Sequence, residues 1–314
     1  MRALRPALWL CALLMTGSAV QADTKTQVSI IGLLASEPQW LPAAEKIAAK
    51  LDHENGLRIV PMSGVGGVAA LQDLANLPLV DVALVASDSL AYAAAQDLLH
   101  GQKDKYNYVA RLAALDVVLV SRRSIGNVAG LAGKRIATGP AQSAAFATGE
   151  LLFNAMNISF ARVAKQDDAA IEALNSGEAD AALFLGTELS TAALSDGRFH
   201  VLNLQIPPSL AGIYQPAILT SRELPGLVTG KQSVETLSAS LTLAIFDRPR
   251  DGPHRNALQN FETMMFKLFA GDGSGNLAAA VPGWKRYAEA QKIIEQAQAA
   301  NIQNLTITPT GGKP

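Results

Sequence analysis

The sequence predicts an α/β fold made of two lobes, each a mainly parallel sheet flanked by helices, with a cleft between them. One observation is that apolar runs alternate with helical patterns along most of the chain, which is typical of parallel sheets covered on both faces. A second is that 74–91 and 174–191 share one order of features: helix, turn, aspartate, buried strand and polar loop. A third is length, because the roughly 290 residues after residue 22 are enough for two domains.

The first part of the chain predicts three strand–helix units. Each apolar run is followed by apolar residues spaced three and four apart, which indicates a helix. Pro42 stands near the start of the first helix, where a missing backbone N–H is tolerated. The predicted strands are 27–34, 56–63 and 80–87, and the helices that follow them are 40–51, 67–76 and 88–99.

The second part continues the alternation with less regular spacing. Residues 108–123 are predicted as a pair of strand segments, and 124–139 as a short helix, a glycine turn and a new strand. The segment 167–186 is predicted as a helix capped by Asp167 or Asp168, ended by Gly177 and followed by a strand. Further predicted strands are 161–166, 198–204, 214–221 and 234–246, and the chain is expected to be helical from Asn256 on, with an interruption at 270–276.

The amino-terminal residues predict a cleavable secretory signal peptide over 1–22. A positively charged start is followed by an apolar run, 7–15, that is too short to span a bilayer. Val20-Gln21-Ala22 fits a small-residue cleavage site, and cleavage is expected after Ala22. The single cysteine, Cys11, lies inside this segment, so the mature chain is expected to contain no disulfide and no thiolate.

Composition and spacing argue against several kinds of chemistry. The formal net charge of −1 gives no electrostatic reason to expect nucleic acid as a partner. The 4 histidines are scattered without the spacing of a metal site, so no metal is expected. The GVGGVA stretch at 64–69 fits a dinucleotide pattern but is more often a tight strand-to-helix turn. No serine lies in a nucleophile elbow, so we expect neither an enzyme nor a cofactor.

Small polar residues follow several of the predicted strands. Ligands of open α/β sheets bind beyond the carboxyl ends of strands, and helix N-termini hold small anions through free N–H groups. The stretch ATGPAQSAAFATGELL at 137–152 is the clearest example, because a strand runs through a polar loop into a helix. For any one loop, helix capping is the alternative. The candidate site residues are Ser36, Ser63, Gly64, Ser87, Asp88, Gln142, Ser143, Gly186 and Thr187.

Several longer blocks resemble one family of proteins. Residues 58–93, 117–155, 167–186, 215–227 and 234–245 are similar to the TAXI family of solute receptors, the extracytoplasmic binding subunits of TRAP-type transporters. The similarity extends over nearly all of the chain after residue 22. The family's anion-binding loop usually reads Gly-Pro-x-Gly-Ser-Gly-Thr. Three of its residues are matched by Gly139, Pro140 and Ser143, whereas Gln142, Ala144 and Ala145 replace two glycines and the threonine.

The resemblance implies the fold of a type II periplasmic binding protein. It also implies capture of a small anionic solute, often glutamate or a related dicarboxylate, for integral membrane permease subunits. Gly139, Ala144 and Tyr214 join the candidate ligand-binding residues on this basis. A monomer in the periplasm is expected. The expected division is one lobe over 23–118, a second over 119–204, and a return to the first over 205–314.

Two other functions stay open from the sequence. The same fold can serve as a periplasmic ligand sensor or as a module that binds another protein. An exported enzyme is a further alternative; it needs a general acid or base in the cleft, for which Asp88 is the candidate. Arg111 is a candidate cation for the site, with a surface or hinge ion pair as its alternative role.

Overall fold

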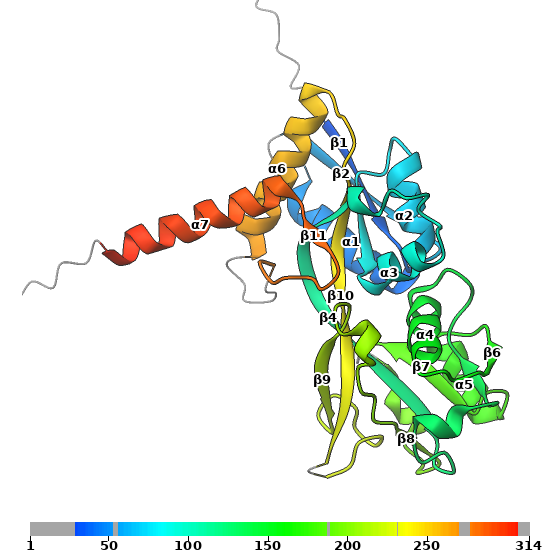
Figure 1. Ribbon diagram of the computed structural model, residues 1–314. Coiled ribbons are helices and arrows are strands. Elements are labelled where there is room, and N and C mark those ends of the chain that lie inside the picture. The colour runs from blue at the N-terminus through cyan, green and yellow to red at the C-terminus, as the bar shows by residue number, and fades with distance from the viewer. Residues whose placement is uncertain (1–28, 53–55, 187–188, 231, 270–276, 307–314) are drawn as a thin grey trace, which may run out of the picture.

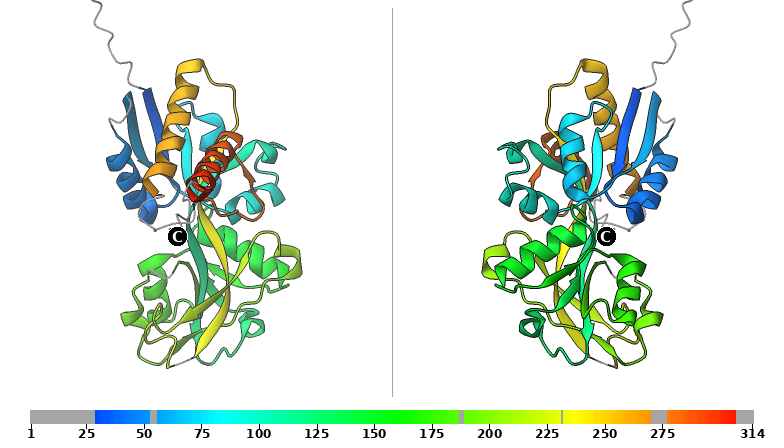
Figure 2. Two further views of the ribbon diagram at one scale, coloured as in Figure 1. Left: turned by 90° about the vertical axis from the view of Figure 1, so that its left-hand side faces the viewer. Right: turned by 90° about the vertical axis from the view of Figure 1, so that its right-hand side faces the viewer.

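The computed structural model describes residues 29–52, 56–186, 189–230, 232–269 and 277–306. The predicted signal peptide, Thr187 and the stretch 270–276 lie outside these ranges. Figure 1 shows two lobes, one above the other, joined by two long strands, and the side views in Figure 2 show the same arrangement. The predicted fold class is therefore confirmed. Within the described ranges, no helix has the length and apolar character needed to cross a membrane.

The upper lobe contains a parallel sheet that the long strands extend. At its centre, β1 (Ser29–Ala35) pairs in parallel with both β2 (Leu57–Ser63) and β3 (Val82–Ala86). The antiparallel strand β10 (Ser233–Phe246) lies next to β3. The helices of this lobe are α1 (Leu41–Leu51), α2 (Gly67–Asn76), α3 (Asp88–Ala95), α6 (Gly252–Phe269) and α7 (Ala288–Thr306), the last of which extends away from the body in Figure 1.

The lower lobe repeats this plan with shorter strands. Here β5 (Arg135–Ala137) lies in parallel between β6 (Ala161–Val163) and β7 (Ala181–Leu185). Two antiparallel strands, β8 (Phe199–Val201) and β9 (Gln215–Thr220), pair with the long strands. The helices are α4 (Ala144–Ala155) and α5 (Asp167–Ser176).

The two lobes are joined by β10 and by β4 (Tyr106–Arg122), which pair with each other antiparallel. The prediction of two strand segments over 108–123 was wrong, because β4 is one strand of 17 residues. Its ends are buried in different lobes, while Ala113 and Ala114 in its middle are exposed. That interruption of the buried pattern made a single strand resemble two.

Several element boundaries differ from the sequence-based expectations. The cap of α5 is Gln166 in extended conformation, not Asp167 or Asp168, which occupy the first turn. Gly177 ends α5 with a φ of 84°, as its prediction as a carboxyl-terminal glycine required. Helix α6 begins at Gly252, before the expected Asn256, and the short strand β11 (Lys285–Arg286) beside β4 was not predicted.

The segment after residue 204 runs first along the lower lobe. Strand β9 pairs with Ser233–Ser238, the first part of β10, and lies beside the lower lobe in Figure 1. Residues 205–314 therefore do not all lie with the upper lobe. We propose that the chain returns to the upper lobe along β10 rather than at residue 205.

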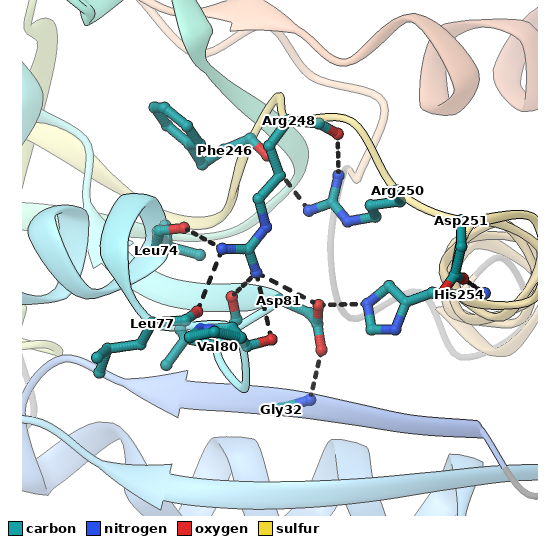
Figure 3. A network of polar contacts seen from close by, with 11 residues as sticks. Gly32, Leu74, Leu77, Val80, Asp81, Phe246, Arg248, Arg250, Asp251 and His254 are labelled. Carbon is teal, nitrogen blue, oxygen red and sulfur yellow. Dashed lines mark hydrogen bonds and ion pairs between the residues drawn. The ribbon is translucent and has the colours of Figure 1, made fainter.

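A polar network fastens the end of β10 and α6 to the upper sheet (Figure 3). Arg248 donates hydrogen bonds to the carbonyl oxygens of Leu77 and Val80 at 3.2 and 3.0 Å, and lies 3.8 Å from the Asp81 carboxylate. Asp81 also accepts the N–H of Gly32 at 3.0 Å and lies 2.6 Å from His254 Nε2. The network holds neighbouring elements of one lobe together, which is a structural role.

Candidate functional site at the contact between the lobes

The amino terminus of α4 is the part of the lower lobe that faces the upper lobe. Ser143 caps this helix, and its Oγ accepts the N–H of Phe146 at 3.1 Å. The preceding loop is tight, with positive φ angles of 81° at Gly139 and 73° at Gln142. The N–H of Gly139 donates to the carbonyl of Lys165 at 2.9 Å, which ties the loop to the strand edge. The helix therefore presents its first N–H groups from a well-held position.

A carboxylate of the same chain binds at this helix terminus. Glu37, from the loop after β1 in the upper lobe, is 2% exposed, and its Oε1 accepts the N–H of Ala144 at 2.7 Å. The N–H of Gly67 at the start of α2 and the side chain of Gln166 also lie near this carboxylate and favour its charged form. Glu37 therefore lies between the amino termini of two helices, one from each lobe.

Burial dominates the ionisation of this group. The loss of water raises the pKa of Glu37 to about 7, and the negative charge of Asp167 adds to the increase. The hydrogen bond from Ala144 and the influence of Gln166 and Gly67 lower the pKa but do not offset burial. The carboxyl group therefore changes charge near neutral pH.

A second buried acid joins the lobes one helical turn further along α4. Asp88, at the first position of α3, is fully buried, and its Oδ2 accepts hydrogen bonds from Thr148 Oγ1 at 2.5 Å and Tyr214 Oη at 2.8 Å. Burial raises the pKa of Asp88, whereas these two donors lower it. Because Thr148 and Tyr214 come from the lower lobe, Asp88 is a polar link between the lobes.

The lobes are in close contact around these acids. A Cβ added to Gly66, whose φ is 146°, would overlap with the carbonyl oxygen of Gln142 in the other lobe. The rings of Tyr92 on α3 and Phe146 on α4 meet edge to face, with their centroids 5.5 Å apart. Figure 1 shows α3 directly above α4. The structure is therefore a closed arrangement of the two lobes.

Three buried hydroxyl groups at strand and helix ends have no hydrogen-bond partner among the described residues. They are Ser36 Oγ after β1, Ser89 Oγ in the first turn of α3, and Thr138 Oγ1 after β5. Ser89 Oγ lies so close to the start of α2 that a Cβ at Gly67 would overlap with it. A buried hydroxyl without a partner is uncommon. Ser36 directly precedes Glu37, and Ser89 directly follows Asp88, so two of the three lie next to an acid of the lobe contact.

Of the predicted site residues, Asp88, Ala144 and Tyr214 take part in the contact between the lobes. Others have different surroundings. Ser63 is exposed at the end of β2. Ser87 is bonded into the sheet, since its Oγ accepts the N–H of Ser240 at 3.0 Å. Gly64 donates its N–H to Ala35 at 2.7 Å, in the turn that was predicted at 64–69. Arg111 donates to Ser240 Oγ at 2.9 Å across the two long strands, so it lies at the hinge.

Gly186 lies in a small depression of the lower lobe, beside the first turn of α5. The depression measures about 60 Å³ and also borders Asp167 and Asp168. Two hollows are larger. One, of about 320 Å³, is lined by residues that include Ser29 and His254. The other, of about 580 Å³, is lined by residues that include Asn127 and Pro208. Ser29 is at the amino end of β1, opposite to the strand end that carries Glu37, so that hollow is separate from the lobe contact.

Sequence reasoning missed the residues that make most of the contact. Glu37 and Thr148 were overlooked, although Glu37 directly follows the candidate Ser36. A charged residue between a buried strand and Pro38 was a usable signal, because chain just before a proline is extended and well defined. Nothing in the sequence pattern indicates that Thr148, inside a helix, faces Asp88.

Comparisons with known proteins find similarity in structure but not in sequence. No protein-family model matches the sequence, and no curated protein matches it significantly. The structure is similar to the GluR0 ligand-binding core from Nostoc punctiforme in complex with L-glutamate, with 13% identity, 85% of this chain and 97% of that chain covered, and a TM-score of 0.47.

Two further solved structures show a comparable likeness. MatC from Rhodopseudomonas palustris with bound malate has 19% identity, with 86% of this chain and 97% of that chain covered, and a TM-score of 0.47. The periplasmic binding protein BugD has 13% identity, with 88% and 97% covered, and a TM-score of 0.49. At these identities and TM-scores the TAXI family stays a proposal.

Proposed function

We propose that this chain is an extracytoplasmic solute receptor of the TAXI type, which holds a small carboxylate between its lobes and delivers it to a TRAP-type membrane permease. The observation that supports this most is the pair of helix amino termini, α2 from one lobe and α4 from the other, that meet around a carboxylate. Helix amino termini attract anions through free N–H groups and the helix dipole. The proposed location is the periplasm, after removal of residues 1–22, and the proposed state is a monomer without enzymatic activity.

The proposed mechanism is closure of the lobes around the solute. The two long strands β4 and β10 are the hinge, and their pairing is irregular after Leu241 and after Leu243, where a change of strand angle is easiest. A solute that touches both lobes stabilises the closed state by its differential affinity for that state. The N–H of Ala144 is the proposed carboxylate donor, with Ser143 beside it. Proposed contacts from the neighbouring loops are Ser36, Gly64, Asp88, Gly139, Gln142 and Tyr214.

The first test is thermal unfolding with amino acids, dicarboxylates, 2-oxo acids and neutral sugars, on protein refolded once to remove carried-over ligand. A solute at about 100 times its dissociation constant adds roughly 2.7 kcal/mol of stability, which is a shift of several degrees. We expect a shift with one class of carboxylate and none with sugars. A shift with neutral sugars alone would reject a carboxylate receptor.

A pair of variants tests the helix terminus itself. Ala144→Pro removes the N–H donor at a helix position where proline is well tolerated, and Ser143 already has the extended conformation that a following proline requires. Ala144→Gly keeps the N–H and is the matched control. We expect the carboxylate-dependent shift to disappear in the proline variant and to persist in the glycine variant.

A second candidate function, a sensor or a module that binds another protein, is favoured by one observation. An internal side chain, the Glu37 carboxylate, accepts the N–H of Ala144 and links the lobes there, so this contact between the lobes needs no solute carboxylate at that N–H. The absence of any shift across the whole solute panel, for the wild type and for Glu37→Ala, would favour this second function.

A further inference from the structure

The anion site between the lobes contains a side chain of the same protein. We propose that Glu37 is a tethered competitor of the solute: its carboxylate holds the lobes together at the amino terminus of α4, and a free carboxylate binds there only by taking its place. This inference rests on the proposed function, because it names the residue that controls the same site.

The loop that carries Glu37 presents the carboxylate in a fixed place. Pro38 follows it, and the N–H of Trp40 donates to the backbone carbonyl of Glu37 at 3.0 Å. Trp40 is 8% exposed as a residue and belongs to the hydrophobic core cluster that includes Ile31 and Leu33, which anchors the loop. A group on such a short tether competes at an effective concentration of the order of millimolar or higher. A free carboxylate therefore competes with an occupant that never leaves the neighbourhood.

The charges around the site also disfavour binding of a free carboxylate beside Glu37. Among the described residues, no lysine or arginine forms an ion pair with Glu37, Asp88 or Asp167. The groups that stabilise the Glu37 carboxylate are amide donors, chiefly the N–H of Ala144. A free carboxylate and an ionised Glu37 repel each other if both are present, so displacement rather than joint binding is expected.

Buried hydroxyl groups nearby are available for the incoming solute. Ser36 Oγ directly precedes Glu37, and Ser89 Oγ lies at the start of α2; both are 0% exposed and without a hydrogen-bond partner among the described residues. The Glu37 carboxylate accepts a hydrogen bond from the N–H of Ala144 but none from these two hydroxyl groups. A free solute that replaces Glu37 and also bonds these hydroxyls regains part of the free energy that displacement costs.

The test measures lobe closure with paired spin labels. Labels are attached to cysteines introduced at Asn260 on α6 and Glu172 on α5, both exposed, in the full chain with Cys11→Ser. Distances are recorded for the parent chain, for Glu37→Ala and for Glu45→Ala, an exposed glutamate of α1 that serves as the control. Each is measured without solute and with acetate, the smallest carboxylate that can replace the missing side chain.

We expect the parent and Glu45→Ala chains to be closed without solute and to change little with acetate. Glu37→Ala should shift to a longer or broader distance, and acetate should restore the short one with an affinity at least about 10-fold tighter than in the parent chain. A Glu37→Ala chain that stays as closed as the parent, or one that opens and does not respond to acetate, would overturn the inference. If acetate closes the variant and yet no biological carboxylate shifts the melting temperature of either chain, the tether stands and the proposed function falls.

Discussion

Glu262 provides the sharpest prediction about stability, because it is a carboxyl group enclosed in the upper lobe. It lies on α6 with 0% exposure, and both of its side-chain oxygens have no hydrogen-bond partner among the described residues. Burial raises its pKa to about 8, with a further increase from Glu289 and a smaller decrease from Arg250. The folded protein therefore holds a proton on Glu262 at neutral pH that the unfolded chain releases.

The sign of the resulting pH dependence follows from proton linkage. Below about pH 4.5 the group is protonated in both states, so its contribution to stability is fully present there. As the pH rises toward 8, unfolding releases the proton, and the free energy of unfolding falls by about 1.4 kcal/mol per pH unit. Between pH 5.5 and 7.5 this amounts to roughly 2.7 kcal/mol. Glu37, with a pKa raised to about 7, adds a fall of the same sign over a narrower range.

The variant Glu262→Gln removes the titration while keeping the size of the side chain. Urea unfolding at several pH values from 5 to 8 gives the slope for the variant and the parent chain. We expect the slope of the free energy of unfolding against pH to be less steep in the variant, by the amount that one released proton contributes. Any constant free energy that the buried amide adds shifts the whole curve and does not change this slope. Glu45→Gln, at an exposed site of α1, should keep the parent slope. Parallel stability curves for Glu262→Gln and the parent chain would refute the reasoning.

Two further predictions concern the contact between the lobes. Thr148→Val removes the hydroxyl donor to Asp88 and should lower the free energy of unfolding by about 1–3 kcal/mol in urea denaturation, because a buried carboxyl loses a partner. A loss no larger than that of the exposed control Thr229→Val would contradict this role. Gly66→Ala should hold the lobes apart and increase the radius of gyration in solution scattering, since its Cβ overlaps with Gln142. Gly101→Ala, at a positive φ of 72° with open space around it, is its control, and equal radii for both variants would reject the steric argument.

Much of the fold followed from local patterns in the sequence. The helix over 67–76 and the long strand over 234–246 were predicted almost to the residue, because their apolar spacing and bounding residues are regular. The crossing strand β4 was misinterpreted as two segments, since its exposed middle at Ala113 and Ala114 breaks the buried pattern. The spacing of apolar residues indicates which parts of a strand are buried. It does not reveal that the two ends of one strand are buried in the cores of different lobes.

The sequence by itself determined the alternation of strands and helices, the two-lobed class, and the polar loop around Ser143 that leads into a helix start and attracts an anion. These properties depend on residues within a few positions of one another. Only the tertiary structure decided what occupies that helix start. The bond from Ala144 to Glu37 joins residues 107 positions apart, and the bond from Thr148 to Asp88 joins residues 60 apart. Such pairs are set by the way the lobes close on the hinge, which no local pattern records, and for that reason the carboxylate at the site proved to be the protein's own.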